Sequence, residues 1–170
     1  MKFNFFTKII IAALIIGCIG FSVLGCGSSH VEEPLANLAR YFETADKEYM
    51  EKALCEADYE IWDEEYSQQM EKVIEEALDK GEVDISYKYD VKKMSSSEIA
   101  EINDTTKGSL AFYDVEMDFT INGGYICTVD AEISKGEDIS EQTLEVKIIK
   151  INGKWYVSDC VPMYRAFTAE

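Results

Sequence analysis

This 170-residue chain has 33 acidic residues, but it lacks the histidine and cysteine patterns that nucleophilic catalysis and metal binding require. The chain holds one histidine, His30, and a Ser–His or Cys–His catalytic pair needs a histidine beside its nucleophile. Because His30 lies in a short polar stretch where we expect it to be solvated, the sequence excludes that class of catalysis. The cysteines that follow it, Cys55, Cys127 and Cys160, are spaced neither as zinc ligands nor as a redox Cys-x-x-Cys pair.

A second group of candidate residues lies on strands that the pattern predicts between positions 110 and 161. Apolar and polar residues alternate over 111–121 and 125–133, which is typical of strands with one apolar face. That face lacks a histidine, and its one carboxylate, Asp159, lies near a strand end, so a packed core is favoured over an acid–base site. A register slip of one residue would invert the lining. If the face does line a cavity, its candidate lining residues are Tyr113, Met117, Phe119, Tyr125 and Trp155.

The opposite face of these strands is acidic. A tight hairpin at positions 122–124 (Asn-Gly-Gly) would place Glu116 near Asp130 and Asp114 near Glu132. Like charges directly opposite each other are unfavourable, and a solvated surface is the simpler interpretation. The alternative is a face that binds a divalent cation or a basic partner. Because no stretch has the pattern of a calcium-binding loop, we predict no metal site.

The remaining pattern predicts the elements that hold these strands in place. Apolar stripes at helical spacing predict two long helices, which would cover the apolar face of the sheet. Ser95 and Glu98 have the spacing of a capping box, and Asn152-Gly153 is typical of a second tight hairpin. The expected order is helices over 34–49 and 57–80, a strand over 83–91, a short helix over 95–102, a return to the sheet over 105–109, and strands over 111–121, 125–133, 143–151 and 154–161, with a looser turn over 134–138.

Two segments, 91–99 (VKKMSSSEI) and 149–157 (IKINGKWYV), carry a likeness to known proteins, together with this order of elements. The chain resembles the nuclear transport factor 2-like (cystatin-like) superfamily, and over 87–160 it is similar to uncharacterised lipoproteins of Gram-positive bacteria. The resemblance implies an α+β fold, a cone in which N-terminal helices pack on a curved antiparallel sheet. The superfamily includes isomerases, dehydratases, ligand binders and protein-interaction modules, so the fold does not determine the function.

The N-terminus has the pattern of an export signal. A basic start with Lys2 and Lys8 precedes an apolar run over 9–24, which is short for a membrane-spanning helix. The segment 23–26 (VLGC) resembles the lipobox of bacterial lipoproteins, which implies cleavage before Cys26 and diacylglycerol on its thiol. A rival box ends at Cys18, but a polar Gly-Ser stretch follows only Cys26. An uncleaved anchor helix is the remaining alternative.

This interpretation divides the chain into a lipoprotein signal peptide over 1–25, a polar tether over 26–33 and one domain over 34–165. We expect acyl chains on Cys26 to hold the domain on the extracellular face of the cell membrane. A net charge of −17 excludes nucleic acid and anionic headgroups as direct partners. Outside the cytoplasm, Cys55, Cys127 and Cys160 allow one disulfide in three pairings, although three buried free thiols are favoured.

We therefore predict a membrane-anchored binding or interaction module without enzymatic activity, metal or cofactor. The expected partners are the membrane, through the lipid anchor, an unknown protein or small ligand, and a second copy of the chain in a homodimer formed through the sheet. The alternative is a small-molecule or peptide carrier, or an isomerase-like enzyme, that uses a cavity between helices and sheet. An interior filled by Trp62, Phe119 and Trp155 would oppose this alternative.

Overall fold

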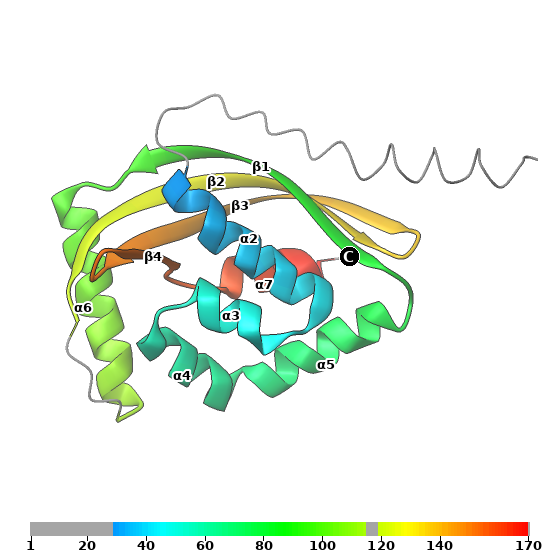
Figure 1. Ribbon diagram of the computed structural model, residues 1–170, viewed down its shortest axis with the longest axis horizontal. Coiled ribbons are helices and arrows are strands. Elements are labelled where there is room, and N and C mark those ends of the chain that lie inside the picture. The colour runs from blue at the N-terminus through cyan, green and yellow to red at the C-terminus, as the bar shows by residue number, and fades with distance from the viewer. Residues whose placement is uncertain (1–28, 115–118, 170) are drawn as a thin grey trace, which may run out of the picture.

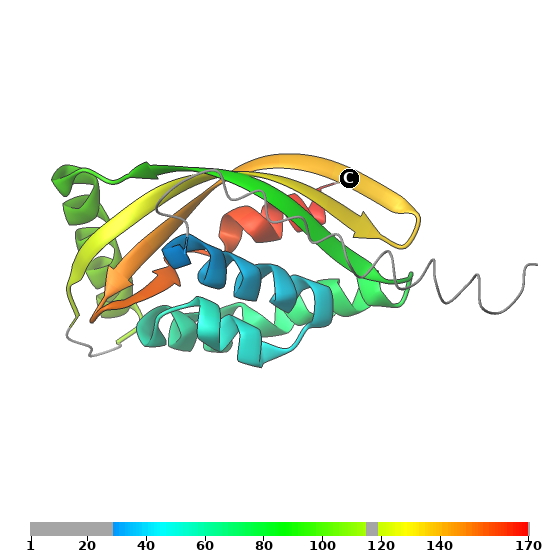
Figure 2. The same cartoon turned by 45° about the horizontal axis from the view of Figure 1, so that its top comes forward.

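The computed structural model describes residues 29–114 and 119–169. Their elements, in chain order, are α2 (Ser29–Thr44), α3 (Lys47–Ala53), α4 (Glu56–Glu65), α5 (Ser67–Leu78), β1 (Val83–Lys93), α6 (Ser96–Phe112), β2 (Ile121–Lys135), β3 (Asp138–Ile151), β4 (Lys154–Val157) and α7 (Val161–Thr168). A curved sheet arches over α2, α3, α4, α5 and α7, and α6 stands at one end of it (Figures 1 and 2). The predicted α+β class, with N-terminal helices packed on a curved antiparallel sheet, is confirmed.

The sheet is an antiparallel meander in the order β1-β2-β3-β4. Asn152 and Gly153 connect β3 to β4 with φ angles of 51° and 85°, the positive values that a type I′ turn requires. This predicted hairpin is confirmed. The turn between β2 and β3 is tighter than expected, because Lys135 pairs directly with Asp138.

The prediction of a hairpin at positions 122–124 is wrong. These residues lie within β2, where the register with β3 shifts between Ile121 and Gly123. Gly124 packs closely here: a Cβ at this position would press on the sulfur of the flexible Met94 side chain and lie 3.1 Å from the carbonyl oxygen of Ile148. The N–H of Met94 also donates to the carbonyl oxygen of Gly124 at 3.0 Å. The glycine therefore brings the end of β1 against β2 instead of reversing the chain.

The return to the sheet expected over 105–109 is also wrong, because α6 continues through Phe112. The strand expected over 111–121 is wrong at its start, where the helix is followed by a turn at 113–114, and positions 115–118 lie outside the described residues. The capping box that starts this helix is confirmed: the N–H of Ser95 donates to Glu98 Oε2 at 2.7 Å, and Ser95 Oγ accepts from the N–H of Glu98. The helix is longer than expected because apolar side chains, together with the buried Thr106, recur at helical spacing along one face and pack toward the interior. This face comprises Ile99, Ile102, Thr106 and Leu110.

Each of the two long N-terminal helices expected from the sequence is divided. Ala45 has a φ of 58°, and Asp46 then caps α3 by accepting from the N–H of Glu48 at 3.0 Å. Tyr66, with a φ of −123° and a ψ of −21°, separates α4 from α5. Neither break contains Gly or Pro, the residues that usually mark a helix end. The apolar stripe of each predicted helix continues across its break, which is why the sequence indicated two unbroken helices.

Helix α2 begins at Ser29 rather than at Pro34, so residues 29–33 are helical and not part of a polar tether. Val31 is fully buried in the core, which gives this first turn its packing. His30 remains exposed, as expected, but its ring stacks on that of Trp155 with centroids 5.2 Å apart and planes 15° from parallel.

A C-terminal helix that the pattern missed replaces the end of the last predicted strand. Strand β4 stops at Val157. Helix α7 begins at Val161, whose N–H donates to Asp159 Oδ1 at 2.8 Å, and Pro162 lies in its first turn. The buried residues of α7 are spaced three and four apart and enter the core between helices and sheet. They are Met163, Ala166 and Phe167.

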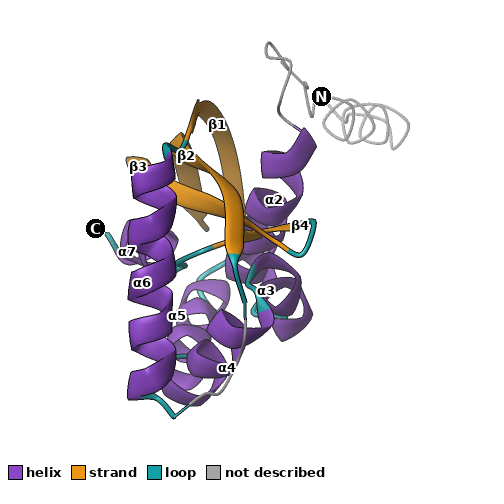
Figure 3. Cartoon of the chain, turned by 90° about the vertical axis from the view of Figure 1, so that its left-hand side faces the viewer, coloured by secondary structure: helices purple, strands orange, loops and turns teal. Residues whose placement is uncertain are grey.

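Buried side chains form two clusters. The larger lies between the helical layer and the inner face of the sheet, and the smaller joins α6 and the start of α4 to the ends of β2 and β3. Figure 3 shows α6 standing at that end of the sheet. Among the helices of the described ranges, none combines the length and apolar character needed to cross a bilayer.

Candidate functional site

The residues predicted to line a cavity do not converge on one site. Tyr113 ends α6, and its phenol oxygen lies 3.2 Å from that of Tyr66. Phe119 is buried in the smaller cluster, whereas Tyr125 and Trp155 pack against the larger one with ring centroids 5.2 Å apart. Met117 lies outside the described residues. The predicted lining is therefore spread over three places.

Core side chains occupy the space between helices and sheet. The ring of Tyr41 meets that of Trp62 edge-on with centroids 5.2 Å apart, and Phe42 lies 5.2 Å from Phe167. Tyr41 and Phe42 are fully buried, and Trp62 is 2% exposed. Burial raises the pKa of the Tyr41 phenol far above its ordinary value, so this hydroxyl stays protonated. The interior is packed by aromatic rings from α2, α4 and α7.

Trp155 packs at the margin of the core, although strand parity places it inward. Its ring lies between aromatic and cationic neighbours: His30 stacks on it, Tyr125 lies beside it, and Lys150 Nζ is 5.4 Å from its centroid. The side chain is half-buried. Trp155 thus joins the start of α2 to the sheet instead of lining an internal cavity.

The acidic pairs predicted across the first hairpin are wrong, because that hairpin is absent. Asp130 lies opposite Thr143 and accepts from its hydroxyl at 2.6 Å, and Glu132 lies opposite Glu141 of β3. Asp114 follows the end of α6 with a φ of 56°, and Glu116 lies outside the described residues. Within 29–114 and 119–169, no three His, Cys, Asp or Glu side chains gather as ligands for a metal ion would.

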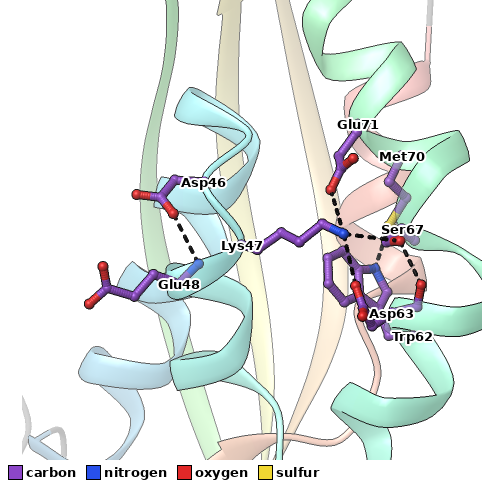
Figure 4. Close-up of polar contacts among 8 residues, drawn as sticks. All are labelled: Asp46, Lys47, Glu48, Trp62, Asp63, Ser67, Met70 and Glu71. Atoms are coloured by element: carbon purple, nitrogen blue, oxygen red, sulfur yellow. Dashed lines mark hydrogen bonds and ion pairs between the residues drawn. The ribbon is translucent and has the colours of Figure 1, made fainter.

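The most connected polar group on the helical layer is centred on Lys47 of α3. Its ammonium lies 2.8 Å from Asp63 Oδ1, 3.1 Å from Glu71 Oε1 and 3.5 Å from Ser67 Oγ (Figure 4). It also lies 5.9 Å from the centroid of Trp62. The Asp63 and Glu71 carboxylates raise the pKa of Lys47, which keeps it protonated and unsuited to act as a nucleophile or base. Lys47 instead joins α3 to the pair α4–α5.

A thiol–carboxyl pair lies at the start of α4. The thiol of Cys55, which precedes this helix, donates to Asp58 Oδ2 at 3.1 Å. Burial raises the pKa of Asp58 from 3.8 to about 6; the hydrogen bond from Cys55 opposes this shift and the charge of Asp159 adds to it. The pKa of this carboxyl is therefore raised well above that of an exposed aspartate, a shift that neither residue type nor spacing indicates in the sequence.

All three cysteines of the described chain are free and buried. Burial raises the pKa of Cys55, Cys127 and Cys160 to about 12 each, and nearby carboxylates add to the shift at Cys55 and Cys160. Because the thiolate is the reactive form, the Cys55–Asp58 pair is not an activated nucleophile.

We expect these three thiols to react with a charged maleimide at least about 100-fold more slowly in the folded protein than in guanidinium. Labelling followed by mass spectrometry of tryptic peptides measures each site separately. Rapid labelling of Cys55 in the native protein would show that this thiol is exposed and reactive, contrary to its position.

A surface pocket of about 270 Å³ lies between α5 and α7. Sequence reasoning did not find it, because α7 was not expected and the two helices are far apart in the chain. Within the pocket the amide of Gln69 approaches the phenol oxygen of Tyr164 at 3.5 Å. Six residues line it: Tyr66, Gln69, Met70, Val161, Tyr164 and Arg165.

Comparison with protein-family models, with curated proteins and with solved structures found no match to this chain.

Proposed function

We propose that the chain is an exported bacterial lipoprotein, cleaved before Cys26 and held on the outer face of the cell membrane by acyl chains on that thiol. The observation that carries this proposal is the segment VLGC at 23–26, placed after a basic start and a short apolar run. Three Cα steps separate Cys26 from Ser29, the first residue of α2, so the domain would lie within about 11 Å of its anchor. Such a short connection would hold one end of the domain against the membrane surface.

The domain in this proposal is a binding or interaction module of the nuclear transport factor 2-like kind. The order of elements supports this assignment: helices, one strand, a capped helix and a meander that ends at Val157. The chain departs from the expected pattern in its four-stranded sheet and in the C-terminal helix α7. The packed interior favours binding at the outer surface over a carrier or isomerase that uses a central cavity, because rings such as Trp62 occupy that space.

Metabolic labelling with an alkyne fatty acid in a Gram-positive host tests the anchor. We expect the full-length chain to incorporate the label and to fractionate with membranes, and we expect Cys26→Ser to lose the label completely. Cys18→Ser is the matched control, since it removes the cysteine of the rival box and should leave labelling unchanged. Label that persists in Cys26→Ser but disappears in Cys18→Ser would move the anchor, and no label in any variant would refute it.

A further inference from the structure

The pocket between α5 and α7 differs from the rest of the molecule in its charge. The chain has 33 acidic and 16 basic residues, yet the pocket lining holds one cation, Arg165, and no acid. The first turn of α5 also carries no acidic residue, and neither does α7. An anion would therefore meet less repulsion here than over most of this strongly acidic surface.

Arg165 has no acidic partner within the described part of the chain. The only other arginine, Arg40, is paired with Glu43 at 2.9 Å. An unpaired guanidinium presents a planar fork of donors that matches the two oxygens of a carboxylate. Its place beside an apolar recess provides both a charge partner and a surface on which an apolar group can be buried.

The other lining residues give the pocket an apolar floor and polar rim. Met70 is 3% exposed, and its sulfur accepts from the indole N–H of Trp62 at 3.1 Å, which ties the floor to the core (Figure 4). At the rim, Gln69 donates to the phenol oxygen of Tyr164, so the hydrogen of that phenol remains available for a ligand. Tyr66 is 44% exposed and adds an aromatic wall.

We propose that this pocket binds a small organic monocarboxylate, with its apolar or aromatic body against Met70, Val161 and the two tyrosines and its carboxylate on Arg165. A volume of about 270 Å³ is below the range typical of drug-sized ligands, which limits the body to roughly one ring or a short alkyl chain. This inference rests on the proposed binding role of the domain, and it is independent of the lipid anchor.

Saturation-transfer NMR on the full-length chain in detergent, with detergent alone as reference, tests the site. The probe is 3-phenylpropanoate, and its neutral isostere is 3-phenylpropanol. We expect a dissociation constant on the order of 1 mM for the carboxylate, and at least about tenfold weaker binding of the alcohol. Cys26→Ser should bind the probe as the unmodified chain does, so failure of the anchor and failure of the pocket are distinguishable.

Three variants separate the guanidinium from the apolar recess. Arg165→Gln should weaken carboxylate binding about tenfold or more, and Arg165→Lys should restore part of it through charge alone. Arg40→Gln, the matched control, should leave binding unchanged. Val161→Phe should fill the recess and abolish binding while the melting temperature stays close to that of the unmodified chain.

Equal affinity for the acid and the alcohol would overturn the proposal, because it would mean that Arg165 recognises no charge. Unchanged binding in both Arg165→Gln and Val161→Phe would place the ligand elsewhere. Absence of saturation transfer from the folded chain at probe concentrations of about 10 mM would also refute the site.

Discussion

Phe167→Ala is expected to lower the free energy of unfolding by about 3–5 kcal/mol. Phe167 is 1% exposed, and it joins α7 to α2 through its contact with Phe42. Its carbonyl oxygen also accepts from Lys135 Nζ at 3.0 Å, which ties the end of α7 to the sheet. Truncation to alanine would leave a cavity in the larger cluster and remove the main apolar anchor of this helix. Urea denaturation followed by tryptophan fluorescence measures the loss.

Phe112→Ala is the matched control for this prediction. Phe112 is 80% exposed at the end of α6, so the same truncation there should change the free energy of unfolding by less than about 0.5 kcal/mol. Equal effects of the two substitutions would mean that α7 does not complete the core.

Asp58→Asn is expected to stabilise the protein above pH 6 by about 1–3 kcal/mol. The folded state holds the pKa of Asp58 at about 6, raised from 3.8 chiefly by burial. A raised carboxyl pKa means that the folded state binds its proton more tightly than the unfolded state does. The resulting stability is fully present below about pH 4 and is lost as the pH rises through 6. The asparagine amide never ionises, so the variant should escape this loss.

Urea denaturation at pH 5 and at pH 8 measures the effect as the difference between the variant and the unmodified chain. Asp104→Asn is the control, since Asp104 is exposed on α6 and its substitution removes the same negative charge from the molecule. We expect Asp58→Asn alone to gain stability between pH 5 and pH 8. A stability difference from the unmodified chain that stays constant with pH would contradict the burial of an ionisable carboxyl beside Cys55.

The sequence predicted those turns and helix ends that are determined by neighbouring residues in the chain. Asn152-Gly153 is a hairpin because both residues adopt positive φ, and Ser95 with Glu98 starts a helix because their side chains satisfy its first N–H groups. The Asn-Gly-Gly run at 122–124 has the same residue types, but it lies within β2, where Gly124 packs closely against Met94 at the end of β1. Residue type alone does not distinguish a glycine for a turn from one for close packing.

The candidate sites were less predictable because they depend on tertiary contacts. The pocket joins Gln69 of α5 to Tyr164 of α7, and no pattern in the sequence brings these two positions together. Asp58 resembles any other acid in an acidic helix, and only its burial beside the Cys55 thiol shifts its pKa. The prediction for Trp155 followed strand parity, which gives the face of a residue but not its distance from the centre of the core.

The most direct test of the proposed lipoprotein anchor is the intact mass of the full-length chain after expression in a Gram-positive host and extraction from membranes. We expect a polypeptide that begins at Cys26 and carries at least the added mass of a diacylglyceryl group on that thiol. A polypeptide that retains Met1, or one cleaved at another position without added lipid, would contradict the proposed anchor.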